Sequence, residues 1–184
     1  MLEPAVITPP AFTVARPRAG EYAPYYERYI SLIEGDDILN TLDQQRREMM
    51  LLISCRDDED GDFRYAPEKW SAKEVLGHIC DTERVFAYRS LTFARSDSTA
   101  LPGFDQDPWV KNANHANIPM KELAEEFVSV RRSTIHFFRH LDPAAWMRRG
   151  TANNNPITVR ALAYLIAGHT EHHLEILRSR YLSE

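Results

Sequence analysis

The feature that most constrains this chain is the recurrence of apolar residues at the three- and four-residue spacing of an α-helix. It is clearest between residues 119 and 141, where intervals of three and four alternate without a break. The positions in this stripe are Met120, Leu123, Phe127, Val130, Thr134, Phe137 and Leu141, of which Thr134 is the one polar interruption. Three further segments have helical spacing, and we find no credible strand. With only 7 glycines in 184 residues, the chain is expected to be all-α and to fold as a four-helix bundle.

Local signals place the first two helices. Helical spacing predicts a first helix over about 37–54, preceded by a short helix around 25–33. The acidic run 57–62 is expected to end the first helix and to form a solvated loop. Ser71 and Glu74 form a capping box, in which each side chain binds the free backbone N–H of the other residue. The second helix therefore begins there and is expected to reach about residue 95.

Prolines bound the third and fourth helices. The polar segment 96–118 is expected to be a long loop, and loops of this length are often functional. Pro119 opens the third helix, since proline is tolerated in a first turn. Asn155 is the expected N-cap of the fourth helix, with Pro156 at its first position. This helix should run to about residue 181.

The N-terminal segment has a different composition. Residues 1–24 contain five prolines, a density that excludes a helix. We expect this segment to be an extended arm lying over the surface of a single bundle domain formed by residues 25–184. A chain of 184 residues has the size of one ordinary domain. The role of the arm is left open.

Charge and composition exclude several classes of partner. A formal net charge of −5 and a pI near 5.8 argue against binding to nucleic acid or to an anionic membrane. No apolar run approaches the ~20 residues of a transmembrane helix, and the first residues lack the pattern of a signal peptide. Cys55 and Cys80 form no disulfide framework. We therefore expect a cytoplasmic location.

Two histidines lie in the apolar stripe of the predicted fourth helix. His169 and His173 are one turn apart in the middle of that stripe, and His172 lies at its edge. Imidazoles one turn apart on one face can chelate a single ion, as in a zinc-binding H-E-x-x-H helix. The alternative is that they are ordinary core histidines, although burying two of them without strong partners costs free energy.

A third histidine joins them from the second helix. His78 lies near the face that carries Val75, Thr82 and Phe86, so its side chain also points inward. Facing helices of a bundle build their metal sites in the core. Three neutral imidazoles leave at least one position open on a tetrahedral ion, which is the pattern of a catalytic site. The predicted ligands are thus His78, His169 and His173.

Other polar residues have open roles. His136 and His140 fall on the solvent side of the third helix, and His115 lies in the long loop. Asp81, one turn from His78, could act as a base or orient a ligand, or could simply solvate the edge of the bundle. Arg89 faces inward, where pairing with a buried carboxylate is favoured over binding a substrate anion.

Two segments resemble a known family. The stretch WSAKEVLGHICDTER at residues 70–84 and the stretch GHTEHHL at residues 168–174 resemble the DinB-like superfamily. That superfamily includes YfiT-type metal-dependent hydrolases and bacterial thiol transferases. The resemblance covers about residue 25 to the C-terminus and implies a four-helix bundle that binds zinc, nickel or a similar divalent ion, often as a homodimer. It also implies that the ligands are His78, His169 and His173.

The ligand set is compatible with more than one chemistry. A divalent ion on three neutral ligands can lower the pKa of water from about 15.7 toward 7 or hold a thiol as thiolate. The resemblance thus implies a hydrolase, or an S-transferase that uses a bacterial low-molecular-weight thiol, with a small-molecule substrate. Neither cysteine is placed for catalysis, so such a thiol must come from outside. The alternatives are a non-catalytic metal-binding or stress-response interaction module, and histidines that only fill the core.

Overall fold

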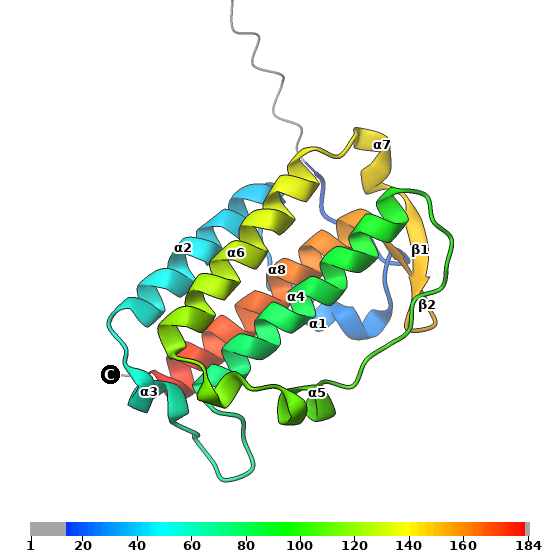
Figure 1. Ribbon diagram of the computed structural model, residues 1–184. Coiled ribbons are helices and arrows are strands. Elements are labelled where there is room, and N and C mark those ends of the chain that lie inside the picture. The colour runs from blue at the N-terminus through cyan, green and yellow to red at the C-terminus, as the bar shows by residue number, and fades with distance from the viewer. Residues whose placement is uncertain (1–13, 183–184) are drawn as a thin grey trace, which may run out of the picture.

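Four long helices pack side by side as a bundle in the computed structural model, which describes residues 14–182 (Figure 1). These helices are α2 (Ile38–Ser54), α4 (Ala72–Ala94), α6 (Met120–Arg139) and α8 (Val159–Ile176). Helix α2 packs on α6 and α8, and α4 packs on the same two helices, so the four contacts close a ring. The four-helix bundle expected from the sequence is confirmed, and the one departure from an all-α fold in the described residues is a short β-hairpin. Within the described residues, no helix combines the length and apolar character needed to cross a bilayer.

Short elements connect the long helices. They are η1 (Pro24–Tyr26), α1 (Glu27–Ile30), α3 (Asp58–Asp62), α5 (Gln106–Asn112), η2 (His115–Asn117), α7 (Pro143–Trp146), β1 (Arg149–Ala152), β2 (Asn155–Thr158) and the π-helical turn η3 (Leu177–Tyr181). Helix α1 lies against α8, and α5 lies beside α4 (Figure 1).

The predicted helix starts of α2 and α4 are confirmed. The Asn40 backbone N–H donates to the Asp37 side chain at 3.1 Å, which caps α2. At α4, the Glu74 N–H donates to Ser71 Oγ at 3.2 Å, and the Ser71 N–H donates to Glu74 Oε2 at 2.7 Å. Both halves of the capping box are therefore formed, and α4 begins as the sequence predicts.

The predicted start of the fourth helix is wrong, because Asn155 and Pro156 belong to a β-hairpin. Strands β1 and β2 are antiparallel, with Ala152 opposite Asn155. Asn153 and Asn154 connect them with φ values of 49° and 61°. A two-residue type I′ turn requires positive φ at both positions, and asparagine tolerates it. The N-cap of α8 is instead Thr158, whose Oγ1 accepts from the Ala161 N–H at 3.2 Å.

Two predicted loops contain short helices. The acidic run forms α3 rather than the expected loop, because Asp57 supplies a complete capping box to the run that follows it. Acidic residues in a first turn also interact favourably with the helix dipole. In the segment 96–118, Asp105 caps α5, and Pro108 lies in the first turn, where its missing N–H has no helical partner to lose.

The core-facing stripe of α6 differs from the prediction. Val130, Phe137 and Leu141 are only half-buried, whereas Arg131 is fully buried. The interface is centred on Phe127, Arg131 and neighbouring residues, so the buried face is rotated from the predicted one. An arginine in an amphipathic helix predicts a solvent-facing position, which is why the pattern misplaced the stripe.

Arg131 binds groups from the three other long helices. Its Nε donates to Glu83 of α4 at 2.9 Å, and its Nη1 donates to the Leu42 carbonyl and to Gln45 of α2 at 3.0 and 3.2 Å. Its Nη2 donates to Thr170 Oγ1 of α8 at 2.7 Å. We call these residues the Arg131 cluster. It satisfies a charge that would otherwise be costly to bury.

Part of the predicted arm lies against the bundle. Residues 1–13 are outside the described residues, and residues 14–23 have no helix or strand. The Tyr164 hydroxyl donates to the Val14 carbonyl at 3.0 Å, and Arg16 Nη1 donates to the Ile33 carbonyl at 2.9 Å. Glu21 is buried and accepts from the Thr158 hydroxyl at 2.9 Å and from Arg160 Nε at 2.7 Å. The division of the chain at residue 24 stays a prediction.

Glu21 should stabilise the fold only when its carboxylate is charged. Burial raises its pKa, but hydrogen bonds from Arg160, Thr158 and the Arg18 backbone outweigh burial and hold the pKa at about 2, below the ordinary 4.5. A lowered pKa gives stability that is complete above the unfolded value and is lost as pH falls toward 2. At pH 7, Glu21→Gln should lower the free energy of unfolding by roughly 1–3 kcal/mol in urea titrations. The difference in unfolding free energy between Glu21→Gln and wild type should become smaller as pH falls from 4.5 to 2.

Glu34 gives a matched control for this prediction because its side chain is exposed. At pH 7, Glu34→Gln should leave the free energy of unfolding nearly unchanged. Equal effects of the two substitutions at pH 7 would contradict the anchoring role of Glu21.

Candidate metal centre

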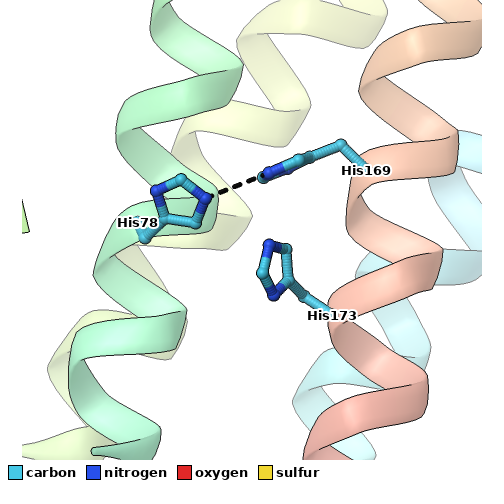
Figure 2. A group of neighbouring side chains, drawn as sticks. All are labelled: His78, His169 and His173. Atoms are coloured by element: carbon cyan, nitrogen blue, oxygen red, sulfur yellow. Dashed lines mark hydrogen bonds between the residues drawn. The ribbon is translucent and has the colours of Figure 1, made fainter. Parts of the chain in front are cut away.

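Three histidines from two helices point toward one another in the bundle core (Figure 2). His78 comes from α4, and His169 and His173 come from consecutive turns of α8. His78 Nε2 lies 3.1 Å from His169 Nε2. One ring nitrogen from each of the three residues lies within 4.8 Å of the other two. The three residues grouped by sequence pattern are therefore brought together in space.

Burial keeps these imidazoles neutral. It lowers the pKa of His78 to about 4, with a smaller contribution from the charge of His115. Burial, followed by the neighbouring imidazoles, also holds the pKa values of His169 and His173 well below the ordinary 6.5. At neutral pH each ring thus has one nitrogen with a free lone pair, which is the form that binds a metal ion.

The separation of the His78 and His169 nitrogens fits a shared ion. A tetrahedral zinc ion with Zn–N bonds of ~2.05 Å separates two ligand nitrogens by about 3.3 Å, and the His78–His169 separation of 3.1 Å is close to this. His173 Nδ1 is buried and has no hydrogen-bond partner among the described residues. A direct hydrogen bond between His78 and His169 would satisfy those two rings but not the third.

Aromatic rings surround the histidines. The Trp70 ring lies 4.9 Å from the His78 ring, and the Tyr29 and Phe86 rings lie 5.6 and 6.3 Å from His169. These rings give part of the site an apolar lining, which lowers the local dielectric constant, so a charge in the centre would act strongly on its neighbours.

Thr82, rather than Asp81, contacts the second nitrogen of His78. Thr82 Oγ1 lies 3.4 Å from His78 Nδ1, one turn further along α4. A proton on Nδ1 directed at this oxygen leaves the Nε2 lone pair facing the other two histidines. Asp81 instead lies 3.4 Å from Arg84 Nη1 and 3.7 Å from His115 Nε2. The sequence did not distinguish these neighbours, because both residues are on the turn that follows His78.

His115 is a buried residue that the sequence left undecided. It belongs to η2, and its ring packs directly on the backbone of Gly77: a Cβ atom there would lie 2.3 Å from the ring. Its Nδ1 is buried without a hydrogen-bond partner in the described part of the chain. Gly77 immediately precedes His78, so this contact places the 96–118 segment against α4 next to His78. His136 and His140 are exposed, as predicted.

The expected pairing of Arg89 is wrong. Its side chain is buried, but no carboxylate of residues 14–182 lies within 4.0 Å of it. The buried carboxylate on the same helix, Glu83, pairs with Arg131 instead. Arg89 Nη2 donates to the Pro102 carbonyl at 2.7 Å.

Three cavities surround the histidines. A cavity of about 280 Å³ extends from His169 to Arg89, one of about 310 Å³ reaches His173, and one of about 320 Å³ borders His78 and His173. Gln106, at the start of α5, lines all three. The histidines are therefore bordered by several cavities, and Gln106 of the 96–118 segment lies at the wall of each.

The family pattern described as the DinB superfamily matches residues 41–177, about three quarters of the chain. The chain belongs to the DinB superfamily. A protein of Oceanobacillus iheyensis that is named a putative metal-dependent hydrolase is 23% identical over 124 residues, covering 66% of this chain and 70% of that protein. The solved structure of YfiT from Bacillus subtilis is described as a probable metal-dependent hydrolase with an unusual four-helix bundle topology. It matches with a TM-score of 0.69 at 15% identity, covering 88% of each chain.

Gly168 should be required for the position of α1 beside the histidines. A Cβ atom at Gly168 would lie 2.1 Å from the Tyr29 carbonyl oxygen, so the two backbones touch. Gly168→Ala should destabilise the protein by about 1–3 kcal/mol through overpacking. In a helix interior without this contact, the same substitution would stabilise by about 1 kcal/mol. The sign of the change in urea-determined unfolding free energy therefore tests the contact, and a stabilised variant would contradict it.

Proposed function

We propose that this protein is a metal-dependent hydrolase whose divalent ion is held by His78, His169 and His173. The observation that carries the proposal is the convergence of three neutral imidazoles, two buried and one partly buried, within 4.8 Å, each bordering at least one of three cavities. The names of the relatives support it, since one is named a putative and the other a probable metal-dependent hydrolase. Imidazole ligands suit zinc, copper, iron and nickel; the resemblance to the DinB-like superfamily implies zinc or nickel, and we propose one of these two as the native ion.

The chain would supply three functions around the ion. His78, His169 and His173 would bind it through neutral nitrogens and leave at least one position open to substrate. Such an ion supplies Lewis-acid chemistry and makes water a stronger nucleophile at neutral pH. Thr82 would hold the His78 ring in the required tautomer, and the rings of Trp70 and Tyr29 would keep bulk water away.

For Asp81 we propose a positioning role instead of that of a catalytic base. Its contacts with Arg84 and His115 favour a positioning function toward His115, which in turn packs beside the start of the site. A homodimer and a cytoplasmic location also stay predictions.

Metal content tests the ligand set. Full-length protein purified without an affinity tag should contain about one divalent ion per chain by elemental analysis. His78→Ala, His169→Ala and His173→Ala should each remove most of it, because two imidazoles bind far more weakly than three. His136→Ala is the control, since that residue is exposed, and it should retain the ion. Full retention by all three ligand variants would exclude the site.

Activity assays separate hydrolysis from thiol transfer. The hydrolase proposal predicts that small ester or amide substrates are cleaved by water, without an added thiol, and that His78→Ala abolishes turnover. Thiol transfer would require an added low-molecular-weight thiol and an electrophile. Cys80 cannot replace that thiol, because burial raises its pKa well above the ordinary value and keeps it protonated. Turnover only with added thiol would replace the hydrolase proposal, and metal binding without any turnover would indicate a non-catalytic module.

A further inference from the structure

Arg89 differs from the other buried cations of residues 14–182. Arg131 lies 2.8 Å from Glu83, and Lys73 lies 2.8 Å from Asp62. Arg89 is 3% exposed and has no carboxylate partner in the same part of the chain. A buried charge without a counter-charge costs considerable free energy. The fold nevertheless buries this arginine, so its missing counter-charge has to be explained.

The surroundings of Arg89 compensate its charge only in part. The guanidinium carbon lies 5.6 Å from the centre of the Phe86 ring and 5.9 Å from that of Phe104. These rings attract a cation but add no counter-charge. Arg89 Nη2 donates to the Pro102 carbonyl, a neutral acceptor that adds no counter-charge. Burial lowers the pKa of Arg89, and the neighbouring Tyr26 hydroxyl partly offsets this.

Arg89 and the histidine cluster border the same cavity. The cavity of about 280 Å³ is lined by Arg89 and by His169, with Thr82 and Phe86 between them. Thr82 and Arg89 are seven residues apart on α4, which corresponds to about 10 Å along the helix. Tyr25, Tyr26 and Tyr29 line the cavity as well. The volume is near the lower limit of small-molecule sites.

We propose that Arg89 binds the carboxylate of a small substrate with an aromatic or apolar body, which lies in the cavity with its cleavable bond toward the histidines. A planar guanidinium pairs with a carboxylate through two parallel hydrogen bonds, and that pairing would supply the missing counter-charge. The apolar body would pack between the tyrosines and Phe86. The binding part of this proposal stands on the cavity alone, and only the reaction rests on the proposed hydrolase function.

The first test compares two probes that differ in charge. 3-Phenylpropanoate and its neutral amide should be titrated into isotopically labelled full-length wild-type protein and followed by two-dimensional NMR. The carboxylate should bind at least about tenfold more tightly, because hydrogen bonds between charged groups are the stronger ones. The chemical-shift changes caused by the carboxylate should be largest for the residues that line the cavity. Equal binding of the two probes, or no binding of the carboxylate, would overturn the proposal. This comparison needs no variant.

Variants then locate the anion. Arg89→Gln should weaken carboxylate binding about tenfold or more, whereas Arg89→Lys should retain part of the preference for the acid over the amide. Arg95→Gln is the matched control, since Arg95 follows α4 and is exposed, and it should bind as wild type does. Circular dichroism should first establish that each variant is folded. Equal weakening by Arg89→Gln and Arg95→Gln would overturn the proposal.

A histidine variant distinguishes this proposal from the proposed function. His78→Ala should keep the Arg89-dependent preference for the carboxylate, even where it has lost its metal and any turnover. If His78→Ala abolishes carboxylate binding and Arg89→Gln leaves it unchanged, the anion binds at the histidine cluster, and the proposed role of Arg89 is wrong. Failure of metal binding with intact Arg89-dependent binding would overturn the hydrolase proposal alone.

Discussion

The buried pair of Arg131 and Glu83 is the interaction on which the arrangement of the bundle depends. Arg131 also binds Gln45, Thr170 and the Leu42 carbonyl, so one guanidinium joins all four long helices. Removing one partner of such a pair typically costs about 3–5 kcal/mol, because a charge is left buried. Thr170 follows His169 directly, and Glu83 lies five residues beyond His78. The cluster therefore fixes the register that brings the imidazoles of α4 and α8 to the same level.

Two arginines show how one side chain serves different purposes in this core. Arg131 is enclosed by acceptors and satisfied by them, so it sets a unique alignment of helices. Arg89 has a carbonyl and two aromatic faces but no carboxylate within residues 14–182, and it borders a cavity rather than packed side chains. At the histidines, burial keeps the imidazoles neutral. The local dielectric and the available partners, rather than residue type, decide what each polar group does.

The histidine cluster could be predicted from the sequence because helical spacing alone places His169 and His173 on one apolar face. The capping box of α4 was equally readable, since it involves residues three positions apart. Arg131 could not be predicted as a core residue, because its burial depends on Glu83, 48 positions away. The hairpin was missed since Asn155 and Pro156 mimic a helix start, and only tertiary contacts select the alternative. The choice of Thr82 as the neighbour of His78 depends on rotamers that spacing does not determine.

The close contact of Gly168 with Tyr29 has a consequence for how this site can diversify. The histidines lie within residues 41–177, which match the family pattern, but the tyrosines of the cavity wall precede that region. Of these tyrosines, Tyr29 contacts α8 through its backbone at Gly168, and its ring also packs near His169 and His172. Exchange of the exposed Tyr25 or the half-buried Tyr26 would reshape the cavity wall without changing a residue of the ion-binding helices. Part of the cavity wall is thus encoded apart from the ion-binding helices and can vary with less effect on them, whereas Arg89 lies on α4 together with His78.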